Sequence, residues 1–270
     1  MTMRMLIAAS LLVASLMPQS LYAAATGDKV LAAAVGAPER DAANKVRDPW
    51  RHPSESLAFW GLKPGMTILE IAPGGGYWSE ILAPYALRTG GHYMAAVSKA
   101  TQTLPAKFAD KQVYGDIHYT VFSADSGPLG PPATADFVLT ARNIHDWMWT
   151  PGMAEKAMAD FYAVLKPGGI LAVEEHRADP RPMVKDARDG YVATAHIIAL
   201  ARKAGFKLEA QSEINANPKD TKDHPFGVWT LPPTRQSAPN EEPPNPGFDH
   251  AKYDAIGESD RMTLRFRKPG

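Results

Sequence analysis

The amino-acid sequence predicts an α/β protein built on a seven-stranded, mostly parallel sheet with helices on both faces. Short apolar segments, each of the length of a buried strand, alternate along the chain with segments of helical periodicity. Turns rich in glycine and proline separate many of these segments. The last two apolar segments have no helical pattern between them, so we expect them to pair antiparallel at one edge of the sheet.

The composition supports a folded domain and excludes several classes of site. The chain has 270 residues, of which 45% are hydrophobic and 21% charged, enough to bury a sizeable core. Lys and Arg number 29, as do Asp and Glu, so there is no basic excess of the kind that nucleic-acid binding requires. The absence of cysteine excludes disulfides, cysteine nucleophiles and thiolate metal sites.

The first 25 residues have the pattern of a secretory signal peptide. Arg4 precedes an apolar run at residues 6–17, which is shorter than the roughly 20 residues needed to span a bilayer. Ala23 and Ala25 form a small-x-small cleavage site. We therefore expect cleavage after Ala25 and export to the periplasm or the extracellular space, with no stable membrane insertion afterwards.

The elements of the mature chain follow in order. Residues 26–62 are expected to form a helical segment, and its residues 50–53 to lie over the binding site as a lid. Residues 63–270 are expected to form one domain, whose helices are predicted at 76–87, 105–113, 151–165 and 186–204. Its strands are predicted at 66–72, 92–98, 117–123, 135–141, 170–175, 206–214 and 261–268. The polar, Pro-rich stretch 215–260 is predicted to be a long irregular loop.

Three consecutive glycines, Gly74, Gly75 and Gly76, follow the first strand and open its helix. In an open α/β sheet the ligand crevice lies at the carboxyl ends of the strands. Glycine there allows a positive φ and a close approach of the backbone to a ligand, and the helix N-terminus presents free N–H groups. The motif favours a small anionic or zwitterionic cofactor, although a glycine turn that only lets helix and strand pack is the alternative.

A dinucleotide site fits the sequence less well. Such a site requires G-x-G-x-x-G and an acidic residue about 20 positions further on. Here Ser79 stands where the last glycine would be, and the second strand ends in Ser98 and Lys99 rather than an acid. Because Ser98 and Lys99 can meet a 2′-phosphate, an NADP-dependent reductase stays open as an alternative.

Several ordered blocks resemble the class I S-adenosylmethionine-dependent methyltransferases. "ILEIAPGGG" is similar to their first motif, "ADFVLTARNIHDW" to their fourth-strand block and "VLKPGGILAVEEHR" to their fifth. "ALARKAGF" is also typical, and the resemblance spans about residues 55–267. More narrowly, "RHPSESLAFWGLKPGM" and "DRMTLRFRKP" look like a group of exported bacterial methyltransferases. The resemblance implies a Rossmann-like fold and S-adenosyl-L-methionine as cofactor.

The resemblance also implies which residues bind that cofactor. Glu70 matches the acid that helps to hold the ammonium side of the cofactor, and Gly74 and Gly76, with Gly75 between them, would lie beneath its methionine part. Ala72 replaces the first glycine of the motif, so the turn is expected to differ.

The ribose position departs from the pattern of the family. Ser98 stands where the family has Asp or Glu, so one hydrogen bond replaces a bidentate carboxylate contact. This would weaken cofactor binding by about ten- to a hundredfold. Asp125 would contact the adenine or compensate in part, and Arg142 would bind cofactor or acceptor.

The candidate catalytic residues follow the fourth and fifth strands. His145 is the first candidate for a base or an acceptor-orienting group, with Asp146 or Glu174 orienting it, and His176 is the second. Histidines at loop starts also bond backbone carbonyls, so a structural role is the alternative. The histidines lack the i, i+4 spacing of a helical metal pair, and we expect no metal.

The sequence therefore predicts methyl transfer from S-adenosylmethionine to an unidentified, small-molecule acceptor. The altered ribose position keeps a second interpretation open, a noncatalytic or repurposed ligand-binding protein on the same scaffold.

Overall fold

The computed structural model describes residues 28–180 and 182–270, and the predicted signal peptide lies outside these residues. A single seven-stranded sheet runs in the order β3-β2-β1-β4-β5-β8-β6. Its strands are β1 (Thr67–Ile71), β2 (His92–Val97), β3 (His118–Val121), β4 (Ala135–Ala141), β5 (Leu165–His176), β6 (Lys207–Ser212) and β8 (Arg261–Arg267). The first five strands are parallel, and β8 pairs antiparallel with both β5 and β6. The predicted fold class is confirmed.

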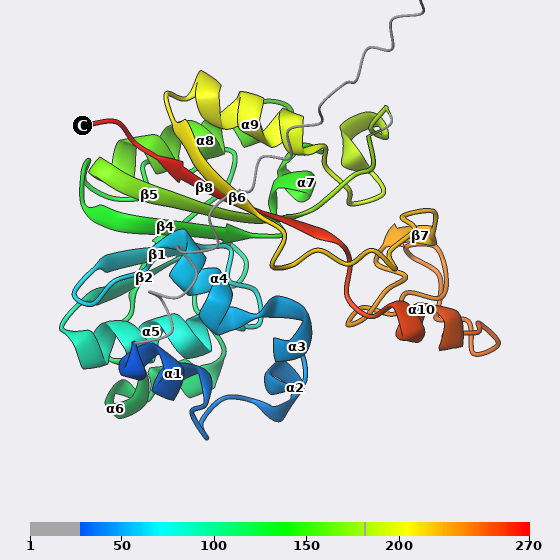
Figure 1. Ribbon diagram of the computed structural model, residues 1–270, viewed down its shortest axis with the longest axis horizontal. Helices are drawn as coiled ribbons and strands as arrows, with labels where there is room; N and C mark the ends of the chain where they lie inside the picture. Colours follow the sequence, from blue (N-terminus) through cyan, green and yellow to red (C-terminus); the bar gives the residue numbers. More distant parts are fainter. Residues whose placement is uncertain (1–27, 181) are drawn as a thin grey trace, which may run out of the picture.

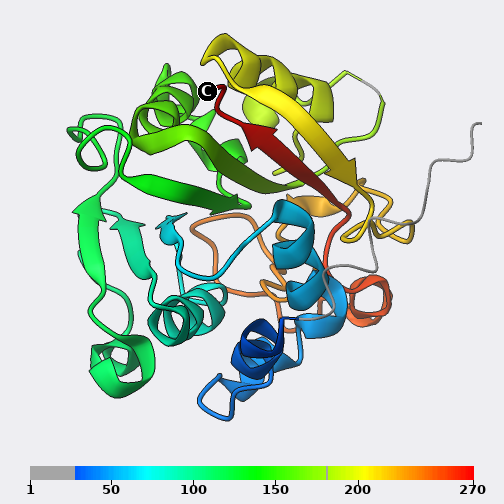
Figure 2. The same cartoon turned by 60° about the vertical axis from the view of Figure 1, so that its left-hand side comes forward.

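Helices cover both faces of the sheet (Figures 1 and 2). One face carries α7 (Ile144–Trp147), α8 (Met153–Val164) and α9 (Thr194–Lys203). The other carries α1 (Lys29–Val35), α4 (Pro53–Trp60), α5 (Ser79–Thr89) and α6 (Lys111–Tyr114). Two apolar cores result, one on each face. The central strands contribute to both cores, which is why they read as continuous apolar runs in the sequence.

Two predicted helices differ from the structure. The segment expected as a helix at 105–113 forms a 3-10 turn (Ala106–Ala109) followed by α6. The long helix expected from residue 186 begins only at Thr194, after a 3-10 turn at Lys185–Ala187. Gly190 has φ 83°, and a Cβ there would lie 2.3 Å from Val228. Val192 bridges to Arg177 beside the sheet, so a tertiary contact outweighs the helical pattern of this stretch.

Segments from both ends of the chain gather at the carboxyl ends of the parallel strands. From the N-terminal side come α2 (Ala42–Lys45) and α3 (Asp48–Arg51), and from residues 215–260 come β7 (Pro225–Val228) and α10 (Ala251–Ile256). Figure 1 places these four elements at the same end of the molecule. In the part of the chain that the structure describes, no helix combines the length and apolarity needed to cross a bilayer.

Candidate active site

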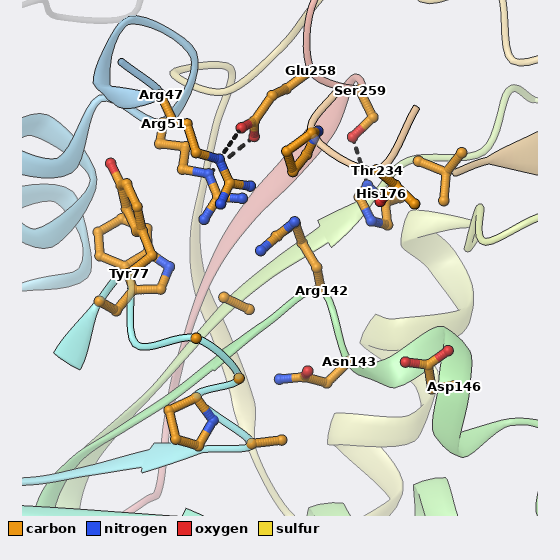
Figure 3. Close-up of a pocket in the computed structure, with 18 of the residues that line it drawn as sticks. Arg47, Arg51, Tyr77, Arg142, Asn143, Asp146, His176, Thr234, Glu258 and Ser259 are labelled. Carbon is orange, nitrogen blue, oxygen red and sulfur yellow. Dashed lines mark hydrogen bonds and ion pairs between the residues drawn. The ribbon is translucent and has the colours of Figure 1, made fainter. Parts of the chain in front are cut away.

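A cavity of about 230 Å³ opens at the carboxyl ends of β1, β4 and β5 (Figure 3). Four regions of the chain line it: the strand ends with their following turns, the segment around α3, the loop after β7, and the residues just before β8. The lining residues used below are Arg47, Arg51, Glu70, Ala72, Gly74, Gly75, Tyr77, Trp78, Arg142, Asn143, His145, Asp146, His176, Trp229, Glu258 and Ser259. The location is the one expected for a ligand site in an open α/β sheet.

The turn after β1 presents bare backbone to the cavity. Gly74 has φ 56°, and a Cβ built on Gly74 or Gly75 would meet no heavy atom within 4 Å. Ala72 takes φ 46°, a left-handed conformation that disfavours side chains, so the turn keeps the shape that a glycine would give it. Gly76 differs, because a Cβ there would lie 2.5 Å from the Phe108 ring, and Gly76 does not line the cavity.

Glu70 ends β1 beneath the cavity and is almost fully buried. Its Oε2 accepts hydrogen bonds from Ser79 Oγ (2.8 Å) and Tyr93 Oη (2.6 Å). Burial raises the pKa of Glu70 to about 7, although both hydrogen bonds act in the opposite direction. A cationic group in the cavity would therefore find a carboxyl group that can ionise in response to it.

The residues expected at the ribose and adenine lie beyond the cavity lining. Ser98 follows β2, and its Oγ accepts a hydrogen bond from Thr101 N (3.1 Å). Asp125 follows β3 and forms an ion pair with Lys99, with both side chains exposed. Lys99 and the neighbouring Ser123 hydroxyl lower the pKa of Asp125 to about 2. These residues lie at the ends of neighbouring parallel strands, along the direction from β1 to β3.

His145 lines the cavity from α7, and a carboxylate from the adjacent strand holds its ring. Nδ1 of His145 lies 2.9 Å from Oε1 of Glu175, and Nε2 lies 3.4 Å from Oδ1 of Asp146. Burial acts to lower the pKa of His145, but the Glu175 carboxylate outweighs burial and raises it above the ordinary value. The contact at Nδ1 leaves Nε2 as the atom that can exchange a proton.

The carboxylate that orients His145 is Glu175, where the sequence had suggested Asp146 or Glu174. Glu175 also accepts hydrogen bonds from the backbone N–H groups of Ile144 (2.6 Å) and His176 (2.9 Å). Glu174 lies one residue earlier on β5, so its side chain leaves the opposite face and forms an ion pair with Arg261 (2.7 Å). Because successive side chains of a strand point to opposite faces of the sheet, Glu175 can reach His145 and Glu174 cannot.

His176 is the less suitable base. Its Nδ1 lies 2.5 Å from Ser259 Oγ. Burial, with the nearby His145 and Arg142 charges, lowers the pKa of His176 well below the ordinary value. His145, Glu175 and His176 hold ligand atoms within 4.8 Å of one another, and they are the cluster that could bind a metal among the described residues. Since Glu175 already accepts three hydrogen bonds from this turn, we interpret it as an orienting carboxylate.

Arg142 and Asn143 follow β4 directly. Asn143 donates from Nδ2 to the carbonyl of Ile71 (3.0 Å), which ties the end of β4 to the end of β1. Arg142 has φ 61° and points into the cavity (Figure 3). With Ala72, it is the second non-glycine residue at this cavity in a left-handed conformation, and such strain is common at functional sites.

A group of charged residues that no sequence motif predicted also lines the cavity. Arg51, on α3, and Glu258, beside β8, are buried and form an ion pair of 2.9 Å. Arg47 joins the same carboxylate at 2.6 Å. These residues lie about 200 positions apart in the chain, and the two halves carry no shared motif. One signal was present in the sequence, the lid expected at residues 50–53, which includes Arg51.

Part of the chain is similar to known proteins. Residues 69–173 match the family described as "Methyltransferase domain". A similar curated protein is the ubiquinone/menaquinone biosynthesis C-methyltransferase UbiE of Hydrogenovibrio crunogenus, 27% identical over 146 residues, which are 53% of this chain and 54% of that protein. The matched part thus spans about half the length of this relative. Residues 69–173 are thus similar to methyltransferase domains, in agreement with the resemblance of the sequence motifs.

Solved structures agree with this fold. A S-adenosylmethionine-dependent methyltransferase from Aquifex aeolicus has a TM-score of 0.55 at 16% identity, over 82% of this chain and 92% of that one. The Burkholderia thailandensis 1,6-didemethyltoxoflavin-N1-methyltransferase, solved with its substrate and S-adenosylhomocysteine, has a TM-score of 0.50 at 15% identity, over 96% and 94%. At these identities the likeness concerns the fold.

Proposed function

We propose that this chain is a S-adenosylmethionine-dependent methyltransferase that acts on a small-molecule acceptor. The observation that carries the proposal is the turn at Gly74 and Gly75, whose backbone lines the cavity without side chains. The buried Glu70, whose pKa is raised to about 7, lines the same cavity. Backbone without side chains allows close approach of a methionine moiety, and the Glu70 carboxyl group would accept its ammonium. The match to methyltransferase domains supports this assignment.

The donor set fits the cofactor, and the chain's residues take distinct roles. When bound, S-adenosylmethionine supplies a methyl group on a positively charged sulfur, which is displaced in line by an electron pair of the acceptor. The protein mainly aligns the two molecules and excludes water. His145 Nε2 takes the proton that a hydroxyl or carbon acceptor loses, while Glu175 holds the ring and balances the imidazolium charge. Ser98, which follows β2 beyond the cavity lining, would contact the ribose.

Calorimetry with the mature protein tests the proposal. S-Adenosylhomocysteine is expected to bind with micromolar affinity to the wild type, and Gly75→Val is expected to abolish binding by filling the cavity. Gly247→Val, in a loop away from the cavity, serves as the control and should bind normally. Unchanged binding to Gly75→Val would refute the assigned site. Binding of NADPH in place of the sulfur ligand would favour the reductase.

The altered ribose position supports a second candidate, a ligand-binding protein that has lost catalysis. If neither S-adenosylmethionine nor S-adenosylhomocysteine binds to the folded mature protein, this second function replaces the first.

We also propose that the protein is exported through the signal at residues 1–25. The charge, length and small-residue pattern of this segment support the proposal. Expression of the full chain should yield a periplasmic or secreted protein whose N-terminal sequence begins after Ala25. A cytoplasmic product that retains residues 1–25 would contradict it.

A further inference from the structure

Guanidinium groups gather on one wall of the cavity. Arg47, Arg51 and Arg142 line it with the Glu258 carboxylate, and Arg261 pairs with Glu258 and Glu174 beside them. Glu258 holds Arg47, Arg51 and Arg261 at 2.6, 2.9 and 3.0 Å. The four guanidinium groups share these two carboxylates, while Glu70 and Asp146 also line the cavity.

Some donors of these guanidinium groups have no hydrogen-bond partner among the described residues. Arg51 is fully buried and donates to Glu258 through Nε alone. Both of its terminal nitrogens, and Nε of Arg142, are buried without a hydrogen bond to any residue that the structure describes. In Figure 3 the guanidinium of Arg142 points toward those of Arg47 and Arg51. Buried charged donors of this kind are costly to a protein and call for an explanation.

The surrounding residues hold these guanidinium groups in place. The Arg51 guanidinium lies 4.3 Å from the centre of the Tyr77 ring, a cation–π distance. Burial and the neighbouring Arg142 charge both lower the pKa of Arg51, which reflects how closely the two cations are held. No residue that the structure describes accepts a hydrogen bond from the terminal nitrogens of Arg51, so a structural role alone does not account for them.

We propose that Arg51 and Arg142 bind an anionic oxygen group, a carboxylate or phosphate, of the methyl acceptor. The planar fork of arginine suits both groups, because two parallel N–H donors match two oxygens. The site would hold an acid such as a keto acid or a phosphate ester, and would place it next to His145. The assignment of this anionic group to the methyl acceptor rests on the proposed function.

The position of the arginines favours the acceptor over the cofactor as the source. The residues assigned to the cofactor follow β1, β2 and β3, whereas Arg142 follows β4 and Arg261 begins β8. The cofactor would therefore extend away from the arginines along the sheet. Its own carboxylate is the competing source, because the methionine part lies at the boundary between β1 and β4.

Binding of simple anions tests the site without the cofactor. Malonate and inorganic phosphate are titrated into the mature protein at low salt by calorimetry. We expect saturable binding to the wild type, and binding at least tenfold weaker to Arg142→Gln. Arg142→Lys keeps the charge but loses the fork, and should bind more weakly than the wild type. Arg88→Gln, on an exposed position of α5, is the control and should match the wild type.

A second titration separates the two sources. If malonate still binds when S-adenosylhomocysteine saturates the protein, the anion belongs to the acceptor and the proposal stands. If S-adenosylhomocysteine displaces malonate, and Arg142→Gln weakens S-adenosylhomocysteine but not 5′-methylthioadenosine, which lacks the carboxylate, the site belongs to the cofactor and the acceptor assignment is overturned.

The remaining outcomes are equally decisive. Failure of both anions to bind to a wild type that folds normally overturns the proposal. Binding of malonate without any binding of S-adenosylhomocysteine preserves the anion site and refutes the methyltransferase function instead. Thermal unfolding of each variant shows whether the loss of Arg142 changes binding or folding.

Discussion

At the scale of single residues, His145 is the proposed base of the chemical step. We expect His145→Ala to lower kcat by about 10² to 10⁴, the usual contribution of a positioned acid or base. The affinity for S-adenosylhomocysteine should stay within about twofold, because His145 contacts the acceptor side. Turnover and calorimetry measured on the same variant check this, once an acceptor is in hand. Unchanged turnover would reduce the histidine to a structural role.

Glu175 acts on the reaction only through His145, and a pH profile distinguishes this role from simple packing. Its charge raises the pKa of His145, so Glu175→Gln should lower that pKa. The acidic limb of kcat/KM against pH should therefore move to lower pH by about one unit while the maximum rate falls. A lower rate with an unmoved limb would show that the residue only stabilises the fold.

Glu70 gives stability a pH dependence of unusual sign for a carboxylate. Its pKa is about 7 in the folded protein and near the ordinary value of 4.5 when unfolded. Between these values the folded state binds more protons, so this contribution is present below about pH 4.5 and lost as pH rises through 7. Glu70→Gln should remove about 3 kcal/mol of this dependence. Urea unfolding at several pH values checks it, with exposed Glu39→Gln as control.

Ser98 tests the ribose assignment. Ser98→Asp restores two acceptors for the ribose hydroxyls and should tighten S-adenosylhomocysteine binding by roughly tenfold. Because the Ser98 hydroxyl also caps Thr101 N, an aspartate that keeps this contact should not reduce stability. Equal affinities of the two proteins would place the ribose elsewhere.

Single residues also mark the limit of sequence prediction. The glycine run and His145 follow strands, so their place at one sheet edge could be predicted from topology. The choice of Glu175 over Glu174 required the face of β5, which a motif does not record.

At the scale of elements, the turn between β1 and α5 contains one glycine that packing requires, Gly76, and one that faces open space, Gly75. Gly76→Ala would force a Cβ to 2.5 Å from Phe108 at φ 89° and should destabilise the fold by about 2–3 kcal/mol. Gly75→Ala, with open space around its Cβ, should change stability by less than about 0.5 kcal/mol. Denaturant midpoints of the two variants measure the difference, and similar losses would contradict this geometry.

Helices and strands could be predicted from the sequence where the burial of apolar side chains alone determines them. Buried parallel strands need continuous apolar segments, and β4 was found with its bounds as predicted, Ala135–Ala141. The helix expected from residue 186 failed because Val192 bridges to Arg177. That contact joins residues 15 positions apart in the chain, so a local sequence pattern does not predict it.

At the scale of the whole molecule, ligand binding should stabilise the fold through linkage. S-Adenosylhomocysteine at one hundred times its Kd adds about 2.7 kcal/mol, which corresponds to a Tm rise of roughly 5–10 °C for a domain of this size. Thermal scans of the wild type check the rise, and Gly75→Val should show none. A rise that persists in Gly75→Val would indicate binding at another site.

The contact between α3 and the segment before β8 is the feature of the whole molecule that was hardest to predict from the sequence. Arg47 and Arg51 meet Glu258 only after the full sheet has formed, since Glu258 stands just before β8. A pairing of this separation leaves no periodic trace in the sequence.

Glu258 comes late in the sequence, so the binding cavity of a growing chain stays incomplete until residue 258 has been added. A chain that stops before β8 lacks a strand that occupies an interior position between β5 and β6. Arg47 and Arg51 would then repel one another without their counter-ion. Termination before residue 258 should therefore give polypeptides without a formed site.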